Sequence, residues 1–454
     1  MKNLLFFLLI LFFNKATTQN KQVLYNFAEL PQTLLLNPAS KTNYNGHIGV
    51  PFLSALSFEG GFSGFVLSDL FANDGIDIND KIINVSNRLT ARDYIKVNSQ
   101  VEVLNGGFRL DNRTYFSVGF YTEIDAFVYY PKDVFTILNE GNSAYLNKNF
   151  LFSAISYKLD VLGVLHFGAS HQFTEKLTLG ARFKVYSSAI NIQSKNNTGS
   201  FVTVAGNDDY YKQILSDINF TSNSSGLIRD DELLDTAEDY LQNVFLVSNL
   251  GAGFDLGITY QISENLEFSG SILDMGFIHH TADILNNTAE GNFTFEGIQF
   301  QFDNNGNYIN DLETRFDRAT LISENERSYI SLRPIKVNAA LKYSFGEIVR
   351  KRIDKYFIKD FYTDAAGVQL HSVFRPLSPQ VALTAFYQKA FTNNLQTKVT
   401  YTIDDLSYSN IGAGISAQFN KVNVYGLIDN ILSYRNLSKA NNLSLQIGVN
   451  LIFN

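Results

Sequence analysis

The chain ends in LSLQIGVNLIFN, residues 443–454, and this stretch decides the fold. Around the polar residues Ser444, Gln446 and Asn450, every second residue is apolar: Leu443, Leu445, Ile447, Val449, Leu451 and Phe453. Side chains alternate between the two faces of a strand, so this period of two predicts a β-strand with one apolar and one polar face. In a membrane barrel the apolar face would contact lipid, and Ser444, Gln446 and Asn450 would face the lumen.

Short and long connections alternate along the rest of the chain. Five short segments place two to four polar turn formers before a new alternating run, which indicates tight hairpin turns: 109–120, 172–183, 261–272, 390–401 and 418–429. The connections between these hairpins are long and polar: 61–93, 129–158, 194–250 and 279–331. Such segments cannot cross a bilayer in contact with lipid. Short periplasmic turns and long extracellular loops are typical of outer-membrane barrels.

Counting alternating segments back from the C-terminus predicts about 14 strands, each near or above the roughly ten residues that a tilted transmembrane strand needs. They are 46–60, 94–109, 114–128, 159–173, 177–193, 251–262, 266–278, 333–345, 365–375, 379–389, 394–402, 409–419, 421–431 and 443–453. The predicted fold is therefore all-β, a transmembrane antiparallel β-barrel whose last strand pairs with the first. A soluble β-sandwich is the alternative, but it does not explain the alternating connections.

Two strands show how the faces are assigned. In the strand at 177–193, Arg182 and Lys184 alternate with apolar residues. They are predicted to face the lumen, because a cation facing lipid at mid-depth is costly. In the segment 266–278, the same period of two places Asp274 on the face that carries Phe268.

The N-terminus resembles a secretory signal. Lys2 precedes the apolar run 4–13, and the spacing of small residues after it predicts cleavage before Gln19, so residues 1–18 would be a signal peptide. The apolar run is shorter than the roughly 20 residues of a membrane helix. Residues 19–45 are predicted to form an N-terminal plug or hatch segment, and residues 46–454 the outer-membrane barrel.

Charge and cysteine content exclude several classes of protein. The formal net charge is −8, and it becomes −10 when Lys2 and Lys15 leave with the signal peptide. This acidic balance argues against a nucleic-acid partner. The chain contains no cysteine, which excludes disulfides, thiolate metal sites and cysteine nucleophiles.

The sequence shows no catalytic or metal-binding motif, so we expect no enzyme activity, no metal and no cofactor. His279 and His280 are neighbours on a predicted strand end, so their side chains point to opposite faces and do not suit one metal. The segment from Asp303 to Asn307 begins like a calcium loop, but Tyr308 replaces the glycine that such a loop needs. Chance histidine pairs stay open, yet no spacing selects one of them.

Three further segments have two interpretations each. Residues 229–245 are predicted to be a loop helix, either a lid over the barrel mouth or a helix packed on its rim. Residues 346–364 could form a short helix or a strand end, or they could dock a periplasmic partner. The aromatics at 129–130 and 150–152 suit either a ligand pocket or, as preferred here, the interfacial girdle.

A resemblance joins these observations. LNPAS at 36–40, followed by GVPFLSALSFEGGFSGF, resembles Bacteroidota outer-membrane barrels related to the long-chain fatty acid transporter (FadL) superfamily, which includes the secretion component PorV. Residues 251–278 resemble a Bacteroidota barrel family of unassigned function. The resemblance implies a 14-strand barrel with an internal N-terminal plug, and it implies that Asn37, Pro38 and Ala39 lie at the plug–barrel junction. A turn that merely leads into the first strand is the compatible alternative.

The expected function follows from the resemblance. It implies FadL-like uptake or binding of a hydrophobic small molecule, in the outer membrane of a Gram-negative, Bacteroidota-like bacterium. The alternative is a PorV-like barrel that does not transport but binds protein partners in secretion or at the cell surface. Val449, Leu451 and Phe453 resemble the C-terminal insertion signal of such barrels, although Asn454 follows the aromatic. The expected partners are outer-membrane lipid, the barrel assembly machinery, a small molecule and a periplasmic or surface protein.

Overall fold

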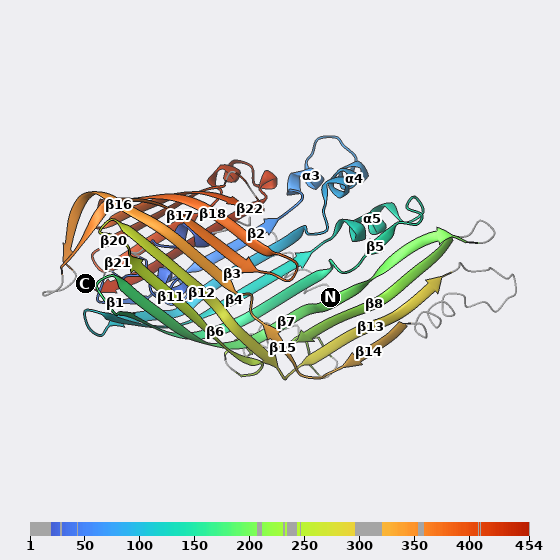
Figure 1. The fold of residues 1–454 in the computed structure, drawn as a ribbon, viewed down its shortest axis with the longest axis horizontal. Helices are drawn as coiled ribbons and strands as arrows, with labels where there is room; N and C mark the ends of the chain where they lie inside the picture. Colours follow the sequence, from blue (N-terminus) through green and yellow to red (C-terminus); the bar gives the residue numbers. More distant parts are fainter. Residues whose placement is uncertain are drawn as a thin grey trace.

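The computed structural model of the chain describes residues 20–453, apart from 28–29, 43, 207–210, 230–231, 234–242, 246, 296–319, 353–357, 407 and 409. The predicted signal peptide therefore lies outside the described residues. Antiparallel strands run obliquely around a closed barrel (Figure 1). Among the described helices, none is long and apolar enough to cross a membrane.

Fourteen antiparallel strand positions form the barrel wall, as the sequence predicted. Each position is called a stave here, because two of them are each made of two shorter strands. In order around the wall they are β1 (Gly46–Gly49) with β2 (Leu56–Phe62), β3 (Tyr94–Arg109), β4 (Thr114–Tyr129), β6 (Ser156–Gln172), β7 (Leu177–Ala205), β11 (Leu250–Gln261), β12 (Leu266–His280), β15 (Tyr329–Leu332) with β16 (Lys336–Arg352), β17 (Ile358–Phe374), β18 (Pro379–Thr392), β19 (Leu395–Asp404), β20 (Asn410–Phe419), β21 (Val422–Ile428) and β22 (Asn442–Phe453). Each stave pairs antiparallel with the next.

The C-terminal strand closes the barrel. Gly46 of β1 pairs with Phe453 of β22, and Leu56 of β2 pairs with Ile447 of β22. Residues 50–55 interrupt this first stave: Phe52, at φ +60°, and Leu53 are exposed, whereas Ser54 is buried and accepts a hydrogen bond from Tyr425 OH at 2.9 Å. The wall remains hydrogen-bonded there, because the N–H of Phe52 donates to Val103 O at 3.3 Å and the N–H of Val449 donates to Leu53 O at 2.8 Å. Every strand edge of the barrel is therefore paired, as a membrane requires.

The outer surface of the wall is apolar. Large side chains with two-fifths to more than half of their surface exposed point outward from most staves, and they include Phe167, Phe254, Leu341, Leu370, Leu383, Val399, Ile415, Leu445 and Ile447. Such a surface is unfavourable in water and matches the lipid-facing band of a membrane barrel. The period of two in the sequence therefore corresponds to a lipid face and a lumen face.

The periplasmic side is built of tight turns and one long hairpin. In the turn between β3 and β4, the backbone N–H of Arg113 donates to Asp111 and holds the pKa of that carboxyl below its ordinary value. The exception is the β16–β17 hairpin, whose ladder continues past Gly346 to the pair Arg352–Ile358. The helical interpretation of 346–364 is therefore wrong for the described residues, since this segment extends the strands.

The extracellular side carries helices and an additional sheet. The loop after β2 forms α3 (Leu67–Phe71) and α4 (Ile78–Arg88), and the loop after β4 forms α5 (Lys132–Glu140) and β5 (Asn149–Leu151). Two 3-10 helices, η2 (Ile431–Arg435) and η3 (Leu437–Lys439), precede β22. The outer half of β7 continues into a sheet with β8 (Tyr211–Ser225), β13 (Ile284–Phe295) and β14 (Thr320–Asn325), which projects beyond the barrel (Figure 1).

Two expectations about these loops change. In the predicted helix 229–245, Arg229 and Glu232–Leu233 belong to a small antiparallel pair of β9 (Ile228–Arg229) and β10 (Glu232–Leu233), whereas Asn243 and Val244 are helical as predicted; residues 230–231 and 234–242 lie outside the described residues. The aromatics assigned to the girdle are partly internal, because Tyr129 and Phe150 are buried. Tyr129 packs edge-on against Phe127, and Lys148 Nζ lies 4.3 Å from the ring centroid of Phe150. The calcium-like segment at 303–307 also lies outside the described residues.

Candidate functional site: the closed lumen

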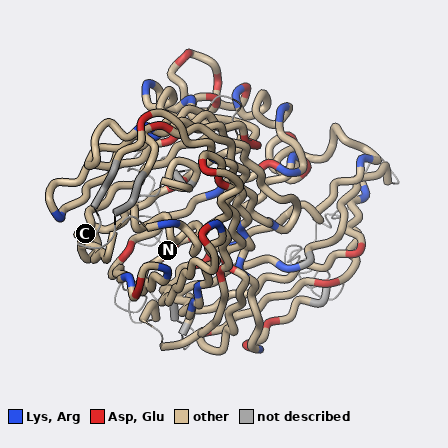
Figure 2. The backbone as a smooth tube through the Cα atoms, turned by 60° about the vertical axis from the view of Figure 1, so that its left-hand side comes forward, with Lys and Arg blue, Asp and Glu red and all other residues tan. Residues whose placement is uncertain are grey.

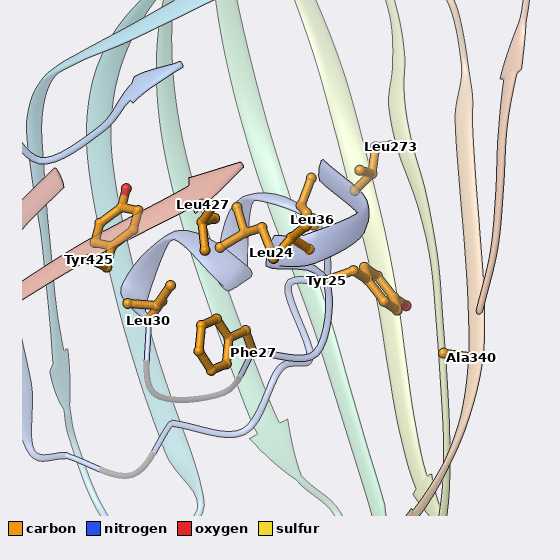
Figure 3. Packing of buried hydrophobic residues seen from close by; sticks show 10 residues of the cluster. Leu24, Tyr25, Phe27, Leu30, Leu36, Leu273, Ala340, Tyr425 and Leu427 are labelled. Atoms are coloured by element: carbon orange, nitrogen blue, oxygen red, sulfur yellow. The ribbon is translucent and has the colours of Figure 1, made fainter. Parts of the chain in front are cut away.

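The N-terminal segment, residues 20–45, lies inside the barrel. It contains α2 (Asn20–Leu24) and η1 (Pro31–Leu35). Its apolar side chains pack against the inner wall in one buried cluster: Val23, Leu24, Tyr25, Phe27, Leu30 and Leu36 meet Leu273, Ala340, Tyr425 and Leu427 (Figure 3). The segment thus buries its own apolar residues in a lumen whose other inward-facing groups are mostly polar, and this burial favours the docked position.

Two sets of polar contacts fasten this segment to the wall. Lys398 Nζ donates to the carbonyl oxygens of Gln22 at 3.2 Å and Tyr25 at 2.5 Å. Gln369 Nε2 donates to Gln22 O at 2.7 Å and to its side-chain oxygen at 2.8 Å. These bonds satisfy backbone carbonyls that would otherwise be buried without partners.

A second contact set lies on the opposite side of the segment. Gln32 Nε2 donates to Glu102 at 2.9 Å and to Asn450 Oδ1 at 3.0 Å, and Asn450 Nδ2 donates back to Gln32 at 3.1 Å. Gln446 Nε2 donates to Tyr425 OH at 2.8 Å. Ser444, like Gln446 and Asn450, is buried on the lumen side of β22. Val449, Leu451 and Phe453 are half-buried on the other face of this strand.

The turn at Asn37, Pro38 and Ala39 lies against the wall at two glycines. Asn37 Oδ1 accepts a hydrogen bond from the N–H of Ala39 at 2.9 Å, which fixes the turn, and Thr259 Oγ1 donates to Ala39 O at 2.9 Å. Gly180 and Gly257 are paired in register on β7 and β11. The turn approaches both so closely that a Cβ at Gly257 would lie 2.1 Å from Asn37 Oδ1.

Gly257→Ala should displace this turn. Overpacking of this kind costs about 1–3 kcal/mol, so the segment is expected to leave its docked position roughly tenfold more often. The measurement is maleimide labelling of a cysteine placed at Ser40, which is buried beside the turn in a chain without native cysteine. Gly426→Ala is the matched control, because a Cβ there would meet no atom within 4 Å. Equal labelling rates in the two variants would contradict the prediction.

A network of buried ion pairs fills the lumen beside the segment. Arg333 donates to Glu123 at 2.6 Å and to Asp160 at 2.9 Å, which connects the β15–β16 stave with β4 and β6. Arg375 binds Asp125 with two bonds of 2.9 and 3.0 Å. Figure 2 shows Lys and Arg positions close to Asp and Glu positions within the barrel. The side chains of this network extend across the interior from staves that are not neighbours in the wall.

The network continues to the N-terminal segment. Lys336 pairs with Asp274 at 2.7 Å, and Lys184 contacts Asp274 at 2.5 Å and Asp255 at 2.9 Å. Arg182 pairs with Asp255 at 3.3 Å and also donates to the carbonyl oxygen of Leu34. Arg182 and Lys184 therefore lie inside the barrel, where they connect the wall to the segment.

Asp274 differs from its predicted position. Strict alternation placed it with Phe268, yet both Leu273 and Asp274 are buried on the inside. The reason is an irregularity in the ladder: Asp274 has φ +59°, and the β11–β12 register shifts between Phe254 and Leu256. Such a bulge redirects one side chain. Sequence reasoning also missed Glu123, whose inward position could have been read from the alternation in β4.

His279 and His280 point to opposite faces of β12, as expected for neighbouring residues on a strand. His279 is exposed outside, and His280 is buried between Ser225 Oγ at 2.7 Å and Ser331 Oγ at 2.9 Å. Among the described residues, no group of three or more His, Cys, Asp or Glu side chains is arranged to hold a metal ion.

Two polar cavities, of about 250 and 320 Å³, lie at the periplasmic mouth on either side of Lys41.

The fold and lumen together define a transmembrane β-barrel of the outer-membrane type, with 14 staves, an apolar belt and a polar, ion-paired interior. The profile of one protein family matches residues 38–429, and the chain belongs to it: the Family of unknown function (DUF5723). No curated protein matches this sequence.

Several solved structures resemble the chain in fold. The toluene transporter TbuX of Ralstonia pickettii has 9% sequence identity and a TM-score of 0.44, with 98% of this chain and 100% of that chain covered. A Pseudomonas aeruginosa FadL homologue has 8% identity and a TM-score of 0.44, with coverage of 96% and 99%. The toluene transporter TodX of Pseudomonas putida has 10% identity and a TM-score of 0.37, with coverage of 96% and 95%.

Proposed function

We propose that this protein binds a hydrophobic or amphipathic small molecule at its extracellular helices and takes it up across the outer membrane of a Gram-negative bacterium. The apolar surface of these helices carries the proposal. Phe71 is 74% exposed and Leu138 is 81% exposed, and further exposed apolar residues lie nearby in sequence: Leu67, Ile76, Ile78, Ile83 and Leu146. Apolar side chains gathered outside the lipid belt are a feature of ligand-binding surfaces.

These helices form one assembly. α3 packs on α4, and α4 packs on α5. Arg88 of α4 pairs with Asp69 of α3 at 2.7 Å, which orients the two helices. A ligand captured there would reach the periplasm only after the N-terminal segment moved, since that segment and the ion pairs occupy the lumen. In this proposal residues 19–45 act as a plug, Asn37, Pro38 and Ala39 are its junction with the wall, and a Bacteroidota origin rests on the sequence resemblance.

The test is binding of the fluorescent apolar probe 1-N-phenylnaphthylamine to the protein in lipid nanodiscs. The double variant Phe71→Ser, Leu138→Ser should bind about tenfold more weakly, because each large apolar side chain contributes about 1.5 kcal/mol or more when covered. Asn79→Ala, Asn139→Ala is the control, with polar changes on the same two loops. Unchanged affinity in the serine variant would refute the proposal.

That negative outcome would favour the alternative function, a barrel that binds a protein partner. The β16–β17 hairpin is the feature that supports it, because its ladder extends well past the tight turns on the same side. A hairpin whose strands extend in this way offers a surface on which a periplasmic protein could dock. Neither proposed role involves a catalytic step.

A further inference from the structure

The additional sheet of β7, β8, β13 and β14 stands above the lipid. β7 has 29 residues, whereas roughly ten suffice for a tilted strand to cross a bilayer. The outward-facing positions of this sheet are mixed: one row holds Ser222, Asn287 and Glu324, and the next row holds Phe220, Ala289 and Ile322. The length of β7 and the projection of this sheet in Figure 1 place it beyond the lipid-facing belt of the wall.

The inner face of this sheet carries an amide row in register across strands. Lys158 faces the lumen, where it pairs with Asp160 at 3.3 Å. Directly paired residues share a face, so the row continues from Lys158 onto the same face: Gln193, Asn223, Asn286 and Asn325. The next row outward holds Lys195 on β7 and then three hydroxyl residues: Thr221, Thr288 and Ser323. The lumen wall thus extends outward as a surface of amides and hydroxyls.

Two amide oxygens in this row lack partners. Asn223 is 8% exposed and Asn286 is 5% exposed, and neither Oδ1 has a hydrogen-bond partner among the described residues. Asn286 uses its Nδ2 fully, donating to Asn325 Oδ1 at 3.1 Å and to Arg327 O at 2.8 Å. Buried polar atoms in folded proteins are nearly always satisfied, by protein, water or ligand. The two oxygens therefore point to a hydroxyl or amine donor from outside the sheet.

The surroundings favour an uncharged donor. At the base of the row, Tyr329 OH donates to Asn191 at 2.8 Å, and its ring stacks on that of His280 with centroids 4.5 Å apart. Lys195, in the row of Thr221, and Glu290, one row further outward, carry opposite charges. Amides and hydroxyls together both donate and accept, which matches the hydroxyl groups of sugars.

We propose that this amide face binds a neutral saccharide, whose hydroxyls donate to the oxygens of Asn223 and Asn286. The shared chemistry could come from a glycolipid headgroup of the outer leaflet or from a soluble oligosaccharide. This site is separate from the apolar helices, so it goes beyond the uptake proposed above and does not depend on it.

The test compares Asn286→Ala with Asn287→Ala, the same substitution one position along β13 and on the opposite face. Protein in phosphatidylcholine nanodiscs is titrated with soluble neutral hexasaccharides (maltohexaose, cellohexaose and mannohexaose), and separately mixed with vesicles containing a neutral glycolipid. Asn286→Ala is expected to weaken binding about fivefold or more, and Asn287→Ala less than twofold. Binding of free sugar identifies a soluble ligand, and binding of vesicles alone identifies a lipid headgroup.

Absence of binding in both arms of the wild-type experiment overturns the proposal, and so does equal weakening by the two variants. If the Asn286→Ala variant does not fold, which loss of its heat-modifiable mobility in SDS gels would show, Asn223→Ala replaces it and Ser222→Ala is its control. The same outcomes then support or overturn the proposal. If the wild-type protein binds sugar but not the apolar probe 1-N-phenylnaphthylamine, that result counts against the proposed uptake and not against the saccharide site.

Discussion

Arg333→Met is expected to destabilise the barrel by about 3–5 kcal/mol, because it leaves Glu123 and Asp160 buried without their shared cation. All three side chains are almost completely buried, so water cannot take over the role of the guanidinium. Lys336, 3.7 Å from Glu123, and Lys158, 3.3 Å from Asp160, compensate only part of the loss. The measurement is urea unfolding in lipid vesicles, followed by the heat-modifiable mobility of the folded barrel.

Two controls separate the ion pairing from the substitution itself. Arg113→Met makes the same change on an exposed periplasmic turn and should alter stability by less than about 0.5 kcal/mol. The triple variant Arg333→Met, Glu123→Gln, Asp160→Asn removes the charges of both carboxylates and should recover much of the loss. An Arg333→Met barrel as stable as the wild type would show that the network contributes little.

Lys398→Met is expected to free the N-terminal segment. The ammonium group donates to the carbonyls of Gln22 and Tyr25, and charge-assisted bonds of this kind each contribute about 1.5–3 kcal/mol. Without it, both carbonyls are buried without that donor, and the docked state should lose at least about 2 kcal/mol. The segment would then be undocked roughly 30-fold more often.

Trypsin applied to the purified barrel measures this release, because cleavage after Lys21 needs the segment outside the lumen. The cleavage rate should rise by at least tenfold in Lys398→Met. Lys421→Met, on the exposed turn before β21, should cleave as slowly as the wild type. Single-channel conductance in planar bilayers should rise in parallel, since the segment occupies the pore. A resistant Lys398→Met variant would mean that apolar packing alone holds the segment.

The wall of the barrel was predictable because its signal is local. Alternation in 443–453 or in 177–193 reflects which face each residue presents, and neighbouring residues suffice to determine it. Chain length and turn composition then set the number of staves and their order. Long polar loops were predicted as well, but not that 194–205, 211–225, 284–295 and 320–325 would form strands. Mixed polar residues on both faces lack the apolar alternation that marks a membrane strand.

The interior was less predictable, and Asp274 shows why. Its direction depends on a bulge between β11 and β12, which one strand alone does not encode. The pairing of Arg333 with Glu123 joins residues 210 positions apart, and it exists only once the wall has closed. Likewise, the close approach of Asn37 to Gly257 depends on where the folded segment lies inside the barrel.

The sequence by itself determined that this protein is a membrane barrel, how many staves it has, and that Arg182, Lys184 and the polar side of 443–453 avoid lipid. Those properties follow from the cost of placing polar groups in hydrocarbon, which acts on each residue separately. Only the tertiary structure decided which charges pair, where the N-terminal segment docks and which amides remain unpartnered. Each of these depends on distances between residues far apart in the chain, and barrel closure sets those distances.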